Sequence, residues 1–354
     1  MLGSGGVLAA GKLLFVSVTS GVNIRNLLGE AGVPRGETTG IDGGPINILL
    51  VGLEFRPDPN MLVHSDTIII MHIPKTRDQA YLIPLPRDIR VEIPDYPKTN
   101  FKSLSTKVKA AFAFGYEGSG SEDEKRARGV ELLALTIRNL AGITFNGAAI
   151  IDFAGFEAVV KELGGVNICV DHPAESIHLA ENDDGKLQRV VYDLETGMID
   201  LLPGYHPVQY KAGCQRLSAE KAMAYARIRM GTCCPNGDYD RQRHQQQLLK
   251  SMVEEATSKG MMSDPVKALR VAKAAGKAFT LDTQGVPFDR FVFMLKGITA
   301  NEMRMVKTNG GEANTISGSS DEQLTVESMQ MLAAIRKGAL TDFFTTHPEY
   351  VAHA

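Results

Sequence analysis

Short, nearly continuous apolar runs recur between residues 46 and 170, and glycine, proline or polar residues bound each of them. Runs of this length that are rich in Ile and Val are typical of strands buried on both faces. They predict strands at residues 46–52, 67–73, 80–85, 147–153 and 166–170.

Segments with the apolar spacing of amphipathic helices lie between and after these runs. They predict helices at residues 122–140, 156–163, 218–226 and 244–258. Residues 171–216 are polar and interrupted by Gly and Pro, which indicates a long excursion or a hairpin. Alternating strands and helices predict an α/β fold with helices on both faces of a sheet.

The two ends of the chain have a different pattern. Leu2 to Val22 is apolar and rich in small residues, but Lys12 interrupts it and the basic start of a signal peptide is missing. We interpret residues 1–23 as the remnant of a membrane anchor or as a weak interfacial helix. Residues 24–45, rich in Gly, Pro and Thr, are expected to be a linker. Residues 46–354 are expected to form one domain with a mobile, Gly/Ser/Asn-rich segment near 308–321.

The overall composition is that of an ordinary globular protein, with 44% hydrophobic and 22% charged residues and a net charge of -3. A near-neutral chain without a long basic run is unlike a general nucleic-acid-binding protein, so no nucleic-acid partner is expected. Any binding of phosphate must therefore depend on a local cluster of charges.

The four cysteines lack the C-x-x-C spacing of a structural zinc site. In an exported protein a bond between Cys169 and Cys214 would close a long loop. Cys233 and Cys234 are adjacent, and a bond between neighbours is geometrically demanding. The sequence leaves the state of all four open.

The densest chemical cluster lies between residues 225 and 245. Arg227 and Arg229 in an extended segment would present two guanidinium groups to the same side. Asp238, Arg241 and Gln245 fall on one face of a predicted helix, with Asp238 at its N-cap. Together these groups predict an anion site, best suited to phosphate. The alternative is a solvated, salt-bridged helix start.

Further polar groups stand at the ends of the predicted strands. Glu54 follows the first strand, Asp66 immediately precedes the second, and Arg87 and Asp88 follow the third. Ligands of open α/β folds gather at such strand ends, and two carboxylates with a diphosphate would suit Mg²⁺. Taken singly, each of these residues is more often a turn residue. Lys107, also taken alone, is more often a surface charge.

Taken in order, these motifs resemble the LytR-CpsA-Psr family over roughly residues 46–255. The segments that carry the resemblance are 49–54, 65–67, 86–88, 107–115, 163–166, 224–229 and 238–246. Residues 213–217, Gly-Cys-Gln-Arg-Leu, resemble the actinobacterial branch of the family.

The resemblance implies an extracytoplasmic, membrane-anchored enzyme that moves a glycopolymer from a polyprenyl diphosphate carrier to peptidoglycan, with Mg²⁺. It also implies a central mixed β-sheet flanked by helices and a hydrophobic pocket for the lipid tail. By this match the metal ligands are Glu54 and Asp66, and the catalytic residues are Asp66, Arg87, Arg229 and Arg241. The diphosphate ligands are His64, Arg87, Lys107, Arg227, Arg229, Asp238, Arg241 and Gln245. The candidate general bases are Asp66, which is preferred, Asp88 and Asp238.

The chain differs from the family pattern at Glu54, His64, Lys109 and His244, where Asp, Arg, Asn and Arg are usual. Histidine is a shorter and titrating donor, so His64 would bind a diphosphate less firmly than arginine. Two alternatives therefore stay open: a hydrolase of polyprenyl diphosphate-sugars and a non-catalytic lipid- or wall-binding protein. Leu248, Leu249 and Met252 are expected to be plain core rather than lipid lining.

Overall fold

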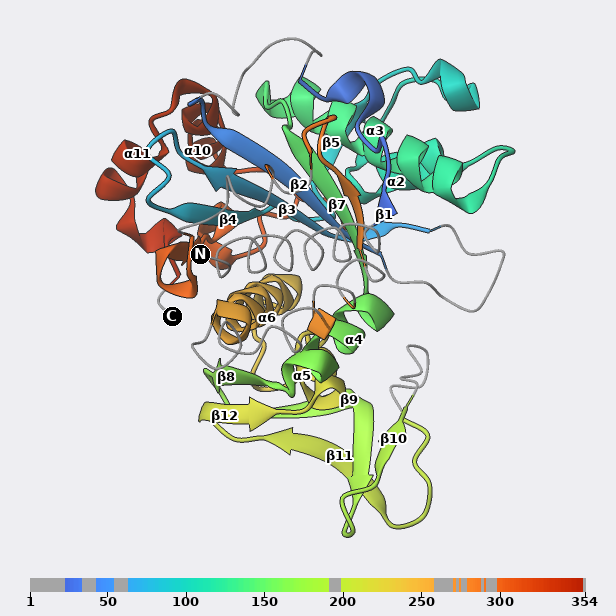
Figure 1. Cartoon of the computed structure of the whole chain (residues 1–354), viewed down its shortest axis with the longest axis vertical. Helices are drawn as coiled ribbons and strands as arrows, with labels where there is room; N and C mark the ends of the chain where they lie inside the picture. The colour runs from blue at the N-terminus through green and yellow to red at the C-terminus, as the bar shows by residue number, and fades with distance from the viewer. Residues whose placement is uncertain are drawn as a thin grey trace, which may run out of the picture.

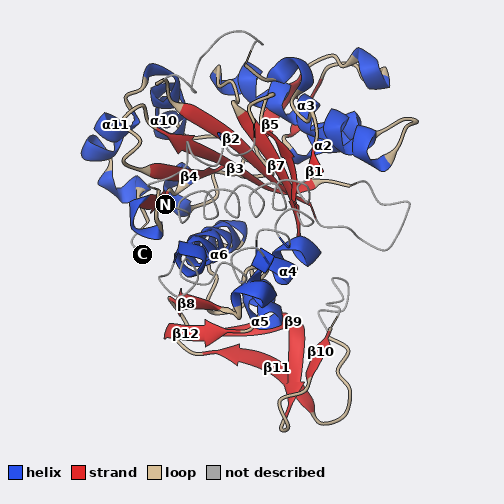
Figure 2. Ribbon diagram, viewed as in Figure 1, coloured by secondary structure: helices blue, strands red, loops and turns tan. Residues whose placement is uncertain are grey.

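A seven-stranded mixed sheet forms the centre of the upper part of the molecule (Figures 1 and 2), and its strand order is β1-β13-β7-β2-β3-β4-β14. This computed structural model describes residues 23–352 apart from 34–42, 54–62, 191–198, 258–269, 272–273, 275–278, 288–289 and 291–297. The strands are β1 (Asn23–Ile24), β13 (Phe279–Asp282), β7 (Gly147–Asp152), β2 (Ile46–Leu53), β3 (Ser65–Ile73), β4 (Ala80–Pro84) and β14 (Met303–Met305).

Parallel and antiparallel pairs alternate irregularly across this sheet. β2 is parallel to β7 but antiparallel to β3, and β3 is antiparallel to β4. The outer pairs β1–β13 and β4–β14 are parallel, whereas β13–β7 is antiparallel. The expected mixed α/β sheet is therefore confirmed, together with the strands predicted near residues 46, 67, 80 and 147.

The continuous apolar runs reflect a sheet that is covered on both faces. Successive side chains of a strand point to opposite faces, so Leu49 and Val51 of β2 enter one core while Ile46 and Ile48 enter another. The first core packs against α2 (Lys109–Tyr116), α3 (Glu122–Ala141), α10 (Val326–Lys337) and α11 (Leu340–Thr346). α3 begins at a capping box formed by Ser121 and Glu124.

The opposite face of the sheet is covered by α6 (Asp238–Thr257), which contributes Leu249 and Val253 to the second core. Beneath it lies a smaller unit (Figure 1) with its own core. This lower unit comprises α4 (Phe153–Leu163), α5 (Ala219–Tyr225), β8 (Val166–Val170), β9 (Ala174–Asn182), β10 (Leu187–Arg189), β11 (Tyr205–Tyr210) and β12 (Gly213–Leu217). The polar excursion at residues 171–216 thus contains β9, β10, β11 and most of β12.

Both pairs of cysteines are bonded. Cys169 of β8 and Cys214 of β12 lie opposite each other in the antiparallel pair and form a disulfide. Cys233 and Cys234 form a second disulfide in the loop before α6. The first bond closes a long loop across the lower unit, as the sequence allowed.

A short hairpin and several single turns complete the described chain. β5 (Arg90–Ile93) pairs with β6 (Leu104–Lys107). The 3₁₀ turns are η1 (Gly29–Ala31), η2 (Pro97–Thr99), η3 (Ala300–Glu302), η4 (Thr308–Gly311) and η5 (Pro348–Tyr350).

Two predictions about the ends of the chain need correction. Residues 24–33, the described part of the predicted linker at 24–45 before residue 34, are not linker: β1 pairs with β13, and the side chains of Leu27 and Leu28 are buried in the main core. Residues 308–321 are not a mobile segment, because Thr308 and Asn309 are buried and Asn309 accepts a hydrogen bond from the Thr325 backbone. Glycine-rich composition misled in both places, since tertiary hydrogen bonds fix these segments.

The expected anchor remnant at residues 1–23 lies, except for Asn23, outside the described residues. Within the part of the chain that the structure describes, no helix is both long and apolar enough to cross a bilayer.

Candidate functional site

Three strand ends meet at one edge of the main sheet. Leu53 at the end of β2 pairs with Ser65 at the start of β3, and Ile69 of β3 pairs with Pro84 at the end of β4. This antiparallel arrangement brings Asp66 and the loop after β4 together, although they are 21 residues apart. Arg87 in that loop donates a hydrogen bond to the carboxylate of Asp66.

The first turns of α6 add a second arginine to this edge. Arg241 donates from Nη2 to the backbone oxygen of Asp66 at 3.1 Å and forms an ion pair with Asp238 at 2.5 Å. The same Asp238 oxygen lies 3.5 Å from Nε of Arg87. Asp238 therefore holds both guanidinium groups at one place, whereas the helix-face pattern grouped it only with Arg241 and Gln245.

The two arginines are buried, and one of them has an Nε donor without a hydrogen bond. The side chains of Arg87 and Arg241 are only 11% and 8% exposed. Nε of Arg87 lies 3.5 Å from Asp238 and 3.6 Å from Asp88, whereas Nε of Arg241 is buried without a hydrogen-bond acceptor. Burial lowers the pKa of Arg241, whereas Asp238, Asp66 and Asp88 outweigh burial and raise the pKa of Arg87. Buried donors of this kind normally find a partner, so the arrangement suits an anionic ligand.

Asp88 connects this pair to two lysines at the rim. Its Oδ1 lies 2.8 Å from Nζ of Lys109 and 3.1 Å from Nζ of Lys107. Burial raises the pKa of Asp88, but Lys109, Lys107 and Arg87 outweigh burial and hold it below its usual range. Lys107 thus joins the cluster through Asp88, and Lys109 provides a further cation that the family pattern does not contain.

The Arg-x-Arg motif forms a turn rather than the extended segment that the sequence predicted. The backbone N–H of Arg227 bonds to Ala224, and that of Ile228 bonds to Tyr225, so the chain continues from α5 in a helical turn. Ile228 is fully buried between the two partly buried arginines. The need to bury this isoleucine in the lower core fixes the turn, and the residues alone gave no sign of it.

Arg227 and Arg229 nevertheless remain in the same charged neighbourhood. Burial, followed by the charges of Arg227, Arg229 and Arg241, lowers the pKa of His178 to about 3. The charge of Arg229 also contributes to the lowered pKa of Arg241. Arginines from both sides of the loop before α6 therefore act on one region.

Two histidines that the sequence analysis did not assign to the site support the arginine turn. The ring of His178, in β9, bonds to the backbone of Arg227, and the ring of His244, in α6, bonds to the backbone of Ile228. His244 is 2% exposed and packs on Tyr225 with ring centroids 4.3 Å apart. Burial lowers the pKa of His244 to about 3, so both rings are neutral. Their positions became apparent only once β9 and α6 were placed beside the turn.

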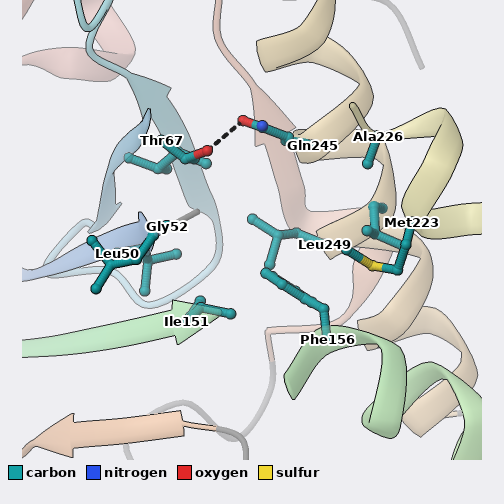
Figure 3. Close-up of a pocket in the computed structure, with 12 residues that line it drawn as sticks. Leu50, Gly52, Thr67, Ile151, Phe156, Met223, Ala226, Gln245 and Leu249 are labelled. Atoms are coloured by element: carbon teal, nitrogen blue, oxygen red, sulfur yellow. Dashed lines mark hydrogen bonds between the residues drawn. The ribbon is translucent and has the colours of Figure 1, made fainter. Parts of the chain in front are cut away.

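An apolar pocket opens next to the charged cluster, between the main sheet and α4, α5 and α6 (Figure 3). It is lined by Leu50, Gly52, Leu53, Thr67, Ile69, Ile151, Phe156, Met223, Ala226, Gln245, Leu248 and Leu249. The hydroxyl of Thr67 donates to Oε1 of Gln245 at 3.0 Å. This polar pair is one helical turn of α6 away from Arg241.

The expectation that three α6 side chains are plain core holds for two of them. Leu248 and Met252 are buried in the lower core, although Leu248 also touches the pocket. Leu249 lines the pocket and is not plain core. Position 52 requires a glycine, because a Cβ there would lie 2.6 Å from the Cβ of Thr67. The lining is apolar apart from the Thr67–Gln245 end.

The predicted metal ligands are only partly visible. Glu54 lies outside the described residues, and Asp66 presents a carboxylate at the edge where the arginines meet. His64 lies partly buried just before β3. Within the described ranges, no three His, Cys, Asp or Glu side chains are grouped closely enough to hold a metal ion.

Comparisons with known proteins show a family match and two related sequences. The model of the LytR_cpsA_psr family matches residues 23–337. The cell wall biosynthesis protein LcpA of Corynebacterium glutamicum is 28% identical over 300 residues, which are 78% of this chain and 51% of LcpA. The polyisoprenyl-teichoic acid–peptidoglycan teichoic acid transferase TagV of Bacillus subtilis is 24% identical over 78% of this chain and 60% of TagV.

The fold is likewise similar to a solved structure. The crystal structure of B. subtilis TagV superposes with a TM-score of 0.57 at 19% identity, over 84% of this chain and 98% of that one. The chain spans about half to three fifths of the length of the two relatives whose sequences it matches.

Proposed function

The chain belongs to the LytR_cpsA_psr family, and we propose that it is a phosphotransferase that moves a glycopolymer from a polyprenyl diphosphate carrier to peptidoglycan. Support comes from the names of its relatives, a cell wall biosynthesis protein and a teichoic acid transferase. The observation that carries the proposal is the position of two buried arginines, Arg87 and Arg241, beside an apolar pocket.

The substrate class follows from the two parts of this site. A polyprenyl diphosphate has a long apolar tail and a compact, multiply charged head. The pocket beside Leu249 and Ile151 suits the tail, because burying apolar surface stabilises binding by about 25 cal/mol per Å². Arg87 and Arg241 suit the head, since guanidinium groups bind phosphate oxygens in a bidentate manner. The pair Thr67–Gln245 would lie at the boundary between head and tail.

The reaction needs positioning and charge neutralisation more than covalent help from the protein. A hydroxyl of peptidoglycan would attack the phosphorus attached to the sugar. The bond from that phosphorus to the bridging oxygen would break, and polyprenyl phosphate would leave with the electron pair. Arg87, Arg229 and Arg241 would stabilise the negative charge that develops on the leaving group. Asp66 and Asp238 keep Arg87 and Arg241 oriented for this role.

We further propose that Mg²⁺ assists at Asp66, together with Glu54 and oxygens of the substrate. The donor set fits in kind, because Mg²⁺ prefers one or two carboxylates, phosphate oxygens and water. When bound, the ion would offset part of the diphosphate charge. Arg87 and Arg241 would bind and orient the diphosphate head group whether or not the ion is present.

We also propose that the protein acts on the outer face of the cell membrane. A polyprenyl carrier resides in a bilayer, and the two disulfides are typical of proteins outside the reducing cytosol.

The test is an assay of the full chain with a polyprenyl diphosphate-sugar and Mg²⁺, with and without peptidoglycan fragments. Release of polyprenyl monophosphate that requires the fragments, together with labelled sugar on them, would support the transferase. Release without an acceptor would favour a hydrolase that uses water. Tight binding without any release would indicate a binding protein and contradict the proposed reaction.

A further inference from the structure

Glu322 lies beside the proposed diphosphate site but belongs to none of the sequence motifs. The strand-like segment around it runs next to the loop that carries Arg87. The Glu322 N–H donates to the backbone oxygen of Asp88 at 2.9 Å, and its own backbone oxygen accepts from the N–H of Arg90 at 2.7 Å. Glu322 is thereby fixed to the loop one residue beyond Arg87.

A tyrosine of α6 fixes the side chain as well. Tyr239 donates from its hydroxyl to Oε2 of Glu322 at 2.6 Å and accepts from Nδ2 of Asn309 at 3.0 Å. Tyr239 directly follows Asp238, the residue that holds Arg87 and Arg241. Backbone and side chain of Glu322 are therefore both tied to residues adjacent to the arginine pair.

The other carboxylates of the site are poorly suited to accept a proton. Asp66 is bonded to Arg87, Asp238 is paired with Arg241, and Asp88 is paired with two lysines. A carboxylate held by a cation is stabilised in its charged form and is a weak base. The carboxylate of Glu322 instead accepts from a neutral phenol, and its side chain is only partly buried.

We propose that Glu322 is the general base of the transfer, accepting the proton of the peptidoglycan hydroxyl, and that Tyr239 positions it. This inference rests on the proposed function. In the step, the hydroxyl O–H bond breaks and its proton passes to the carboxylate of Glu322. The hydroxyl oxygen bonds to the sugar-linked phosphorus, and polyprenyl phosphate leaves with the electron pair of the broken P–O bond. The proton then passes from Glu322 to solvent.

The surroundings of Glu322 agree with this role. Burial raises the pKa of Glu322, Asp88 and Asp238 raise it further, and the Tyr239 hydrogen bond and Lys107 oppose them. A base is most effective when its pKa approaches the working pH. Burial and the bond to Glu322 also raise the pKa of the Tyr239 hydroxyl, so it stays protonated as a donor.

The test compares three variants of the full chain in the transfer assay. Glu322→Gln keeps the size and the Tyr239 contact but removes the base. It should lower kcat by about 10²–10⁴-fold, with little change in the KM for the polyprenyl diphosphate-sugar and in the melting temperature. The acidic limb of the pH–rate profile should disappear. The matched control is Glu327→Gln, at an exposed position of α10, which should behave as wild type.

Tyr239→Phe separates a base from a purely structural residue. Loss of its hydrogen bond should raise the pKa of Glu322 further, so the acidic limb should move to higher pH while the fold survives. Wild-type kcat and an unchanged pH profile in Glu322→Gln would overturn the inference, as would a loss of activity explained by weaker substrate binding or unfolding. An inactive wild type would contradict both the proposed function and this inference. An active wild type whose kcat is equalled by that of Glu322→Gln would contradict this inference alone.

Discussion

The main sheet and the lower unit differ in the size of their hydrophobic cores and in how they are stabilised, although both contribute to the same site. The main sheet has cores on both faces, and its large core extends from α2 and α3 to α10 and α11. The lower unit has a smaller core of its own, and a disulfide joins its β8 and β12. Small cores supply little stability, so cross-links commonly support them.

The site lies where these two regions meet, with α6 between them (Figure 1). Asp66 of β3 and Arg87 of the loop after β4 come from the main sheet, whereas the segment from α5 to α6 supplies Arg229, Asp238 and Arg241. The apolar pocket likewise has one wall from β2, β3 and β7 and the other from α4, α5 and α6. The difference indicates that binding depends on both regions, while stability can be lost from the lower one first.

The largest expected effect comes from removing one arginine on each side of this boundary. Arg87→Ala and Arg229→Ala should each lower the release of polyprenyl phosphate by about 10²–10³-fold, because each removes a donor to the developing charge. The exposed Arg304→Ala in β14 is the matched control and should keep full activity. Circular dichroism should show all three folded. If only one of the two site variants lost activity, the site would not depend on both regions.

Removing the disulfide between Cys169 and Cys214 should destabilise the lower unit more than the main sheet. The double variant Cys169→Ser/Cys214→Ser should lose about 2–4 kcal/mol of unfolding free energy, the usual contribution of a disulfide that closes a long loop. Hydrogen exchange should speed up in β8 and β12 and stay unchanged in β2 and β3. Equal loss of protection in all four strands would contradict separate stabilisation.

Acid should weaken the support of the arginine turn. The folded-state pKa values of His178 and His244 are lowered to about 3, so both histidines bind protons more readily when unfolded. Their contribution to the free energy of unfolding is complete above the unfolded-state pKa of about 6.5. It is lost as the pH falls toward 3, by up to about 1.4 kcal/mol per pH unit for each histidine.

Urea unfolding between pH 7 and pH 5 measures this loss. The double variant His178→Gln/His244→Gln should show a shallower pH dependence than the wild type. His72 in β3, whose pKa burial lowers to about 4, should account for part of the remaining slope. An equally steep slope in the variant would mean that the two rings do not stay neutral in the folded protein.

The smallest effect is expected from filling the pocket. Leu249→Trp places a larger side chain from α6 into the apolar space. It should raise the KM for a long-chain substrate by about 10-fold, or 1.4 kcal/mol, and change the KM for a short-chain analogue little. The control is Leu202→Trp, because Leu202 lies between β10 and β11 and is 56% exposed. Equal changes for both chain lengths would argue against a tail in the pocket.

The sequence predicted the long central strands of the main sheet better than its short strands. The strands around β2, β3, β4 and β7 followed from continuous apolar runs, because burial on both faces leaves a strong local signal. The strands β1, β13 and β14 are only two to four residues long, so they depend on pairing partners far away in the chain.

The same division holds for the site. The grouping of Asp238 and Arg241 follows from helical spacing, and their meeting with Arg87 follows from strand ends at one edge of the sheet. His178 and Glu322 could not be found in this way. Each reaches the site through tertiary contacts of a segment whose own sequence is polar or glycine-rich.

The most direct test of the account is a crystal structure of the full chain with a polyprenyl diphosphate bound. The account predicts phosphate oxygens within hydrogen-bond distance of Arg87, Arg229 and Arg241, and a tail that enters between Ile151 and Leu249. A diphosphate bound by one region alone, or a tail lying outside this pocket, would contradict the claim that the site is assembled where the main sheet and the lower unit meet.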